Sequence, residues 1–345
     1  MLKPILWPVL VPSLLFSIGI GATIPVYVLA ALQLGAGNAL ASGTVTLMGA
    51  VSLIFTVPVG ILIDRVGDRR AMTLGTVAAV VVTALTVFAL AAPLAQPLAL
   101  TLYIVLLLLR APVEDIWRLA RQAVVAEHMP PAHLGKAMTA LGGTMRVGNL
   151  LGPLISAALL VWLPLWSVYV FSCLCAVLAV VILNIPALNR GFDDAAARSS
   201  RAGTEEPVPE IGAATGAAEP EGPAEAAADL AERAEPAPPS PRPSLRTLAV
   251  DWHAVWLAGV GILVLAVARV LQPLMVQLWG ASIGLHESGI SLLVAVGAAI
   301  ELVLMFPGGY LKDRLGRVAV LTACLAVFGA GFVLMGAVPT VAGLV

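Results

Sequence analysis

Hydrophobic residues occur along this chain in long uninterrupted blocks, and most polar residues lie in the short segments between them. The blocks predict nine helices, over residues 5–32, 44–63, 71–91, from about 98 onward, 137–160, 166–188, 255–280, 289–310 and 319–338. Apolar runs of about 20 residues can each cross a bilayer as a helix. Only helices or closed barrels satisfy the backbone in lipid, and the blocks lack the alternation of barrel strands. We therefore expect an all-α polytopic membrane protein.

The composition supports a membrane location. The chain is 60% hydrophobic and 11% charged, whereas a soluble domain carries about 25% charged residues. The net charge of −1 gives no indication of nucleic-acid binding. The first block is longer than the core of a signal peptide, which has about 7 to 15 residues, so we interpret it as an uncleaved membrane helix. The three cysteines lie in apolar blocks, where they are expected to serve as packing residues.

A segment of different composition separates the sixth and seventh predicted helices. Residues 189–250 are rich in Ala, Glu, Pro and Gly and contain no aromatic residue after Phe192. Such a segment cannot bury enough apolar surface to offset its ordering entropy, so it predicts a disordered linker. The chain then divides into a six-helix half over 1–188, the linker over 189–250, and a partial second half over 251–345.

Basic residues are concentrated in alternate connections between the predicted helices. They follow the second, fourth, sixth and eighth helices, while the connections after the first, third and fifth contain neither Lys nor Arg. Positively charged loops face the cytoplasm. We therefore expect a multi-pass protein of the cell membrane whose N-terminus and linker are cytoplasmic.

A charged motif occurs twice, six helices apart. GILIDRVGDRR and GYLKDRLGR both contain G-x-L-x-D-R-x-G. Its last glycine permits a turn with positive φ, its first lets a neighbouring helix approach, and its aspartate suits a helix N-terminus. Internal repetition is typical of transporters, although one copy alone could be a plain basic loop. The residues assigned to this conformational latch are Gly60, Asp64, Arg65, Gly67, Arg69, Gly309, Asp313, Arg314, Gly316 and Arg317.

The helix that begins near residue 98 carries charges within its apolar part. Its charged or aromatic positions on one face are Arg110, Glu114, Trp117, Arg118 and Arg121, while Asp115 points partly away. A charge at the bilayer centre costs at least about 2.5–3.5 kcal/mol, so these side chains are expected to face protein or water. Glu114 is one turn from both Arg110 and Arg118 and can pair with either.

The second half carries isolated polar residues in its helices. Arg269, Gln272 and Gln277 interrupt one helix, and Glu301 lies inside the next. Arg269 and Glu301 each need a partner and can pair with one another. A cavity-facing Glu301 would suit proton exchange. The residues assigned to a substrate and proton path are Arg110, Glu114, Trp117, Arg118, Arg269 and Glu301; a purely structural set of ion pairs is the alternative.

The helix over 137–160 contains RVGNLLGPLISA. Its glycines Gly148 and Gly152 have G-x-x-x-G spacing, which brings helices close together. Pro153 removes a backbone donor and favours a bend. From the residues alone, this stretch is a packing seam.

These motifs resemble those of the major facilitator superfamily. Its signature G-x-L-a-D-R-x-G-R-[KR] is matched from Gly60 to Gly67, with Asp68 where the family usually has arginine. The resemblance implies twelve helices in two sets of six, with this turn as a latch between the halves. Only three helices follow the linker, so the second half is expected to be cut after its third helix.

Two further similarities suggest a direction of transport. Gly148, Gly152 and Pro153 match the start of G-x-x-x-G-P-x-x-G-G, which in this superfamily is typical of exporters that exchange substrate for protons; small residues replace its last two glycines. Arg110 matches the arginine of R-x-x-q-G, which the family associates with proton transfer, although Glu114 stands in the glycine position.

We therefore expect a monomeric secondary transporter, embedded in the lipid bilayer, that exports small amphipathic molecules in exchange for protons by alternating access. An importer of the same fold, or a non-transporting remnant or receptor, are the alternatives. The sequence shows no catalytic constellation, P-loop or metal-ligand spacing. We accordingly expect no enzymatic activity, cofactor, bound metal or nucleic-acid partner.

Overall fold

The protein is described by a computed structural model that covers residues 6–129, 131–185, 252–315 and 317–337. These residues are almost entirely helical and contain no strand, which confirms the predicted fold class. The predicted linker over 189–250 lies outside the described residues. We call residues 6–185 the first half and residues 252–337 the second half.

The first predicted helix consists of four consecutive pieces. A π-helical turn (η1, Leu6–Leu10) leads into α2 (Val11–Thr23), which is followed by a 3₁₀ turn (η2, Ile24–Val26) and by α3 (Tyr27–Gln33). Pro25 lies in the 3₁₀ turn and has no backbone N–H to donate. The helix is thus interrupted in its middle.

The other helices follow the predicted order with shifted ends. They are α4 (Asn38–Val66), α5 (Asp68–Ala91), α6 (Gln96–His128), α7 (Pro131–Trp162), α8 (Trp166–Asn184), α11 (Trp252–Ser282), α12 (Glu287–Leu315) and α13 (Arg317–Ala337). Several helices begin earlier or end later than predicted, because backbone hydrogen bonding extends beyond the apolar residues at both ends of a block. Eight spans in the described residues are long and apolar enough to cross a membrane, while α13 contains a shorter apolar stretch.

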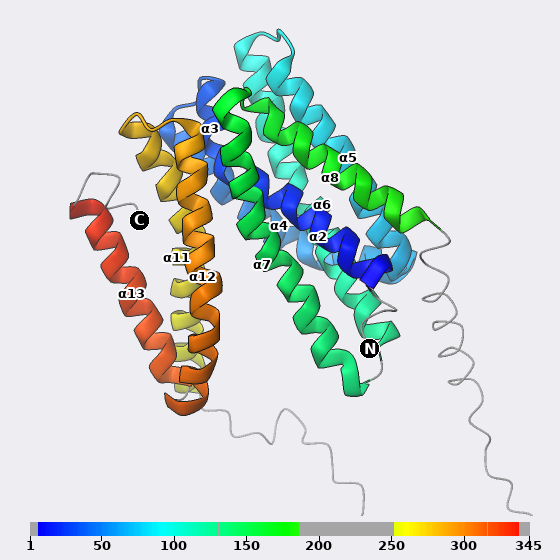
Figure 1. Ribbon diagram of the computed structural model, residues 1–345, viewed down its shortest axis with the longest axis vertical. Helices are drawn as coiled ribbons and strands as arrows, with labels where there is room; N and C mark the ends of the chain where they lie inside the picture. The colour runs from blue at the N-terminus through cyan, green and yellow to red at the C-terminus, as the bar shows by residue number, and fades with distance from the viewer. Residues whose placement is uncertain (1–5, 130, 186–251, 316, 338–345) are drawn as a thin grey trace, which may run out of the picture.

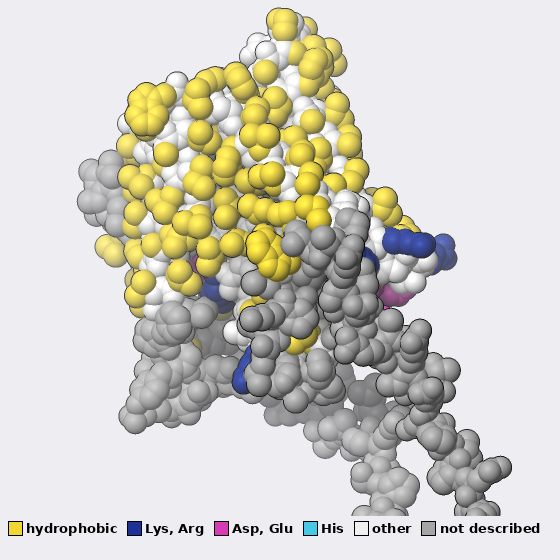
Figure 2. Space-filling model, turned by 45° about the vertical axis from the view of Figure 1, so that its right-hand side comes forward, with side chains coloured by type: hydrophobic (Ala, Val, Ile, Leu, Met, Phe, Trp, Pro, Cys, Tyr) yellow, Lys and Arg dark blue, Asp and Glu magenta, His cyan; other side chains and the backbone are white. Residues whose placement is uncertain are grey.

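The surface agrees with a membrane environment. Figure 2 shows a broad hydrophobic face, with the visible Lys, Arg, Asp and Glu side chains near its lower part. Large side chains such as Leu53, Val57 and Val303 are exposed, which an aqueous surface would disfavour. This protein is therefore a multi-pass membrane protein.

The first half packs through a seam of small residues. Helix α2 lies against α7 and α8, and α5 lies against α6 and α8. A Cβ added at Gly152 would lie 2.7 Å from the Cα of Gly21, and one added at Gly148 would lie 2.7 Å from the carbonyl oxygen of Ser17. The predicted packing role of Gly148 and Gly152 is confirmed. Helix α7 continues through Pro153.

The two halves meet mainly along α7 and α12. Ser156 contacts Ser291, with 3.4 Å between their Oγ atoms, and Arg146 contacts Glu301. Ser156 follows Arg146 by ten positions and Ser291 precedes Glu301 by ten. The helices are therefore antiparallel neighbours that keep one register over about 15 Å.

The two halves share a buried hydrophobic core toward one end of the molecule. One buried cluster combines first-half residues such as Val28 and Leu160 with second-half residues such as Leu274 and Ile290. The other described cluster, which includes Ile63 and Met129, contains first-half residues only. The mixed cluster lies toward the connections 34–37, 163–165 and 283–286, which Figure 1 shows together at the top. The halves are joined at the end whose connections lack Lys and Arg.

We predict that Gly152→Val destabilises the protein, because the added methyl groups must displace the backbone of α2. Overpacking of this kind costs about 1–3 kcal/mol. Thermal unfolding of the purified protein in detergent measures the effect as a lower midpoint. The control is Gly142→Val on the same helix, where an added Cβ meets no atom within 4 Å. Equal midpoints for the two variants would contradict the seam.

Candidate functional site

A cavity of about 380 Å³ lies between the two halves. Its apolar wall comes from α4 and α11, with residues such as Val45, Met48 and Leu274. Its polar side chains come from helices of both halves: Tyr27, Ser52, Glu114, Asp115, Arg269 and Gln277. A mostly apolar cavity with a few convergent polar groups is the usual form of a small-molecule site.

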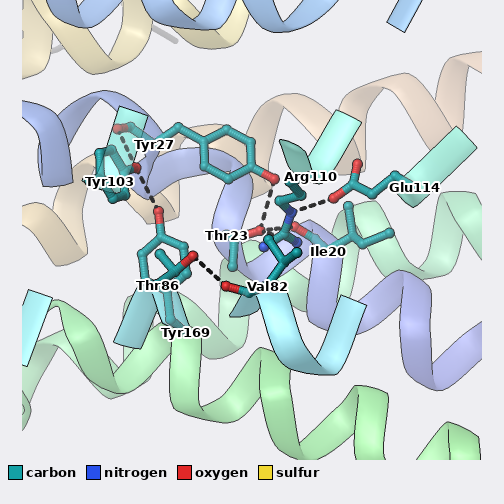
Figure 3. Close-up of polar contacts among 9 residues, drawn as sticks. All are labelled: Ile20, Thr23, Tyr27, Val82, Thr86, Tyr103, Arg110, Glu114 and Tyr169. Carbon is teal, nitrogen blue, oxygen red and sulfur yellow. Dashed lines mark hydrogen bonds and ion pairs between the residues drawn. The ribbon is translucent and has the colours of Figure 1, made fainter. Parts of the chain in front are cut away.

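Arg110 and Glu114 form an ion pair at the inner wall of the cavity (Figure 3). Arg110 Nε donates to Glu114 Oε1, and Arg110 Nη2 donates to Thr23 Oγ1 at 3.0 Å. The guanidinium also lies over the ring of Tyr27, 5.6 Å from its centroid. Arg110 is only 5% exposed, while Glu114 lines the cavity. The carboxylate thus faces the cavity, with its counter-ion behind it.

Asp115 belongs to a second, separate pair. It accepts hydrogen bonds from Ser52 of α4 and from Arg118 Nη2, the latter at 2.5 Å. Of the two arginines available to Glu114 in the sequence, the structure selects Arg110, because Arg118 is held by Asp115. Both carboxylates on this part of α6 are therefore neutralised by an arginine of the same helix.

Trp117 lies away from the cavity, which corrects its assignment to the substrate path. It is 2% exposed and packs against Phe16, with 4.2 Å between ring centroids. The guanidinium of Arg121 lies 4.1 Å from the Trp117 ring centroid. The indole faces α2 and the core of the first half, so it serves packing. Sequence spacing placed it on the charged face of α6 but could not show what that face meets at this level.

Glu301 connects the two halves through arginines. It pairs with Arg269 of α11, which confirms the pairing predicted from the sequence, and with Arg146 Nη1 of α7 at 3.5 Å. All three side chains are partly exposed. Sequence reasoning missed Arg146 because it lies at the start of the glycine motif, where no intramembrane partner was evident. The signal available in the sequence was that Glu301, isolated in an apolar helix, could attract a second cation.

Side chains of α6 and α11 bind backbone carbonyls at and just after the interrupted turn of the first helix. Tyr103 of α6 donates to the carbonyl of Tyr27 at 2.9 Å, and its hydroxyl also contacts that of Tyr169 on α8 at 2.8 Å (Figure 3). Gln277 of α11 donates to the carbonyl of Ile24 at 3.1 Å. The carbonyls of Ile24 and Tyr27 are thereby paired within the protein, as lipid requires.

The first copy of the latch motif forms the turn between α4 and α5. Gly67 has φ +89° and separates the two helices, as predicted. Asp64, Arg65 and Arg69 are exposed near this turn. Asp68 is the first residue of α5, where a negative side chain is favourable. That position gives a physical reason for its departure from the family pattern.

Other latch residues behave differently or cannot be assessed. A Cβ added at Gly60 meets no described atom within 4 Å, so the predicted close helix approach there is wrong for the described residues. In the second copy, Gly309, Asp313 and Arg314 lie within α12 and Arg317 begins α13. Their side chains, and Gly316 altogether, lie outside the description.

A bundle of membrane helices in two halves, with a cavity between them, is the architecture of a secondary transporter. The family model described as Major Facilitator Superfamily matches residues 9–268. The chain therefore belongs to the major facilitator superfamily, and the resemblance found in the sequence is confirmed.

A solved structure agrees in fold. The chain is similar to the crystal structure of D-xylose-proton symporter, with a TM-score of 0.60 and 13% sequence identity over 99% of this chain and 77% of that chain. At this identity the similarity concerns the fold alone. A search of curated proteins gave no match. In the part of the chain that is described, no three His, Cys, Asp or Glu side chains are grouped to hold a metal ion.

We predict that Glu114→Ala destabilises the protein by leaving the buried Arg110 without its counter-ion. Removing one partner of a buried pair costs about 3–5 kcal/mol. The double variant Arg110→Met/Glu114→Ala should unfold at a higher temperature than the single variant, because no uncompensated charge remains. Thermal unfolding in detergent compares them, with exposed Lys136→Ala as the control. A double variant less stable than Glu114→Ala would argue against the pair.

Proposed function

We propose that this transporter exports small amphipathic molecules in exchange for protons by alternating access. The carrying observation is the cavity between the halves, whose polar lining comes from helices of both. A binding site shared by two bodies changes its access when one body rocks against the other. The predicted division into 1–188, linker 189–250 and 251–345 supplies the two bodies, and we propose that the protein works as a monomer.

The orientation of the structure suits loading from the cytoplasm. The halves are joined at the end whose connections lack Lys and Arg, and the mixed core lies there. We propose that the opposite end, which carries the α4–α5 turn, faces the cytoplasm of the cell, because basic loops remain on that side. The cavity would then receive its cargo from the cytoplasmic side.

The chemistry of the cavity favours amphipathic cargo. An apolar surface from α4 and α11 faces the carboxylates of Glu114 and Asp115 and the guanidinium of Arg269. Such a site binds an apolar body by burial and orients it through a few polar groups. Export rather than import is proposed because Gly148, Gly152 and Pro153 resemble the start of a motif that is typical of exporters in this superfamily.

Glu301 is the proposed proton-binding residue. Its charge attracts Arg146 of the first half and Arg269 of the second. A proton on Glu301 weakens both attractions, so it changes the electrostatic contact between the two bodies. We propose that the α4–α5 turn, with Asp64, Arg65, Gly67 and Arg69, then governs the movement as a latch.

Export is tested by measuring accumulation of a panel of dyes and antibiotics in cells that express the protein. We expect lower accumulation of at least one amphipathic compound than in cells without the protein. A proton uncoupler should abolish the difference, because the exchange needs the proton gradient. Energy-dependent accumulation would instead indicate import. No change for any compound, with the protein verified in the membrane, would contradict transport of this class.

We predict that Glu301→Gln abolishes pH-driven transport, because the amide cannot bind and release a proton. Purified protein in proteoliposomes is tested with an exported compound, with and without an imposed pH gradient. Exchange of the compound down its own gradient should persist in the variant. Glu287→Gln, at the start of the same helix and outside the ion cluster, is the control. Unchanged stimulation by the pH gradient in Glu301→Gln would remove Glu301 from the coupling step.

A further inference from the structure

Gln277 of the second half makes a buried polar contact with the backbone of the first half. Its side chain is 3% exposed in the middle of the mixed core. Its Oε1 accepts from the N–H of Val28 at 3.1 Å, and its Nε2 donates to the carbonyl of Ile24 at 3.1 Å and to that of Pro273 in its own helix at 3.1 Å. All the hydrogen-bonding capacity of its NH₂ group is therefore used.

The two groups that Gln277 holds stand in a particular relation. The carbonyl of residue 24 and the N–H of residue 28 are four positions apart, the pair that a continuous α-helix joins to each other. Here the 3₁₀ turn with Pro25 interrupts the helix between them. A primary amide carries one acceptor and a donor side by side, so one side chain can serve both groups.

The contact lies where the transport cycle must open the protein. Gln277 and Ile24 both line the cavity, and Val28 belongs to the core that joins the halves. If the halves separate at this end, Gln277 must leave the backbone groups of Ile24 and Val28. Buried donors and acceptors that lose their partners carry a penalty until water or another group replaces them.

We propose that Gln277 is a positioning residue that holds this end of the transporter closed through the interrupted turn of the first helix. The proposal rests on the alternating access described above. It assigns the closed state to a specific polar clamp, in addition to apolar packing. Because the clamp borders the cavity, displacement of the amide releases the halves at the site where cargo is bound.

The clamp is tested by a disulfide that forms only when this end is closed. Ser156 and Ser291 are fully buried with their Oγ atoms 3.4 Å apart, so Ser156→Cys/Ser291→Cys places two thiols near bonding distance. Cys173, Cys175 and Cys324 are replaced by alanine in this background. Formation of the cross-link under mild oxidation is followed over time in membranes.

Gln277→Met keeps the length of the side chain and removes its donors and acceptor. We expect it to slow cross-linking about tenfold or more, because buried backbone groups left without partners disfavour the closed state. Gln272→Met is the matched control, since Gln272 is exposed on the same helix. Cross-linking of Gln277→Met at the control rate would overturn the proposal.

A second measurement separates opening from loss of structure. A single cysteine from Met48→Cys, in the cavity wall, is labelled with a membrane-impermeant thiol reagent added on the side of connection 34–37. Labelling should increase in Gln277→Met and stay low in Gln272→Met. If Gln277→Met does not fold, Gln277→Asn, whose amide is one methylene too short to reach both groups, takes its place with the same expectations. Because neither assay needs cargo or a pH gradient, failure of the export assay leaves this result interpretable.

Discussion

The interruption of the first helix at Ile24–Val26 is the constraint on which much of this structure depends. In a membrane protein, backbone groups released by a broken turn have no water to bind and must find partners inside the bundle. Gln277 of α11 supplies partners for the carbonyl of Ile24 and the N–H of Val28, while Tyr103 of α6 binds the carbonyl of Tyr27, the first residue of α3. The second half therefore approaches the break directly through Gln277, and the cavity lies beside this point.

The charged side chains of the interior obey the same constraint. Arg110 is shielded by Tyr27 and Thr23 and neutralised by Glu114, which leaves only the carboxylate side of the pair toward the cavity. Glu301 differs, because its two arginines come from different halves. The first arrangement maintains a site within one body. The second is an ion cluster between the two halves, in which one carboxylate attracts a cation from each.

Glycine residues have different roles in two parts of the first half. The Gly148–Gly152 seam lets α7 lie directly on α2. At the α4–α5 turn, Gly67 has a positive φ and reverses the chain direction, and a Cβ added there would meet no described atom within 4 Å.

The sequence by itself determined the membrane location, the helix order and the turn at Gly67, because these follow from composition, from the length of apolar runs and from glycine's access to positive φ. The superfamily was indicated by the resemblance of the motif from Gly60 to Gly67. The sequence also placed Glu114 among arginines and paired Arg269 with Glu301. Only the tertiary structure decided that Glu114 pairs with Arg110 and that Trp117 is buried in the core. It also decided that Gly60 has no close neighbour among the described residues. The contacts of Arg146 and Gln277 with the other half were likewise visible only in the structure. Helical periodicity defines which residues share a face. It does not show which helix that face will contact, or at which position along that helix.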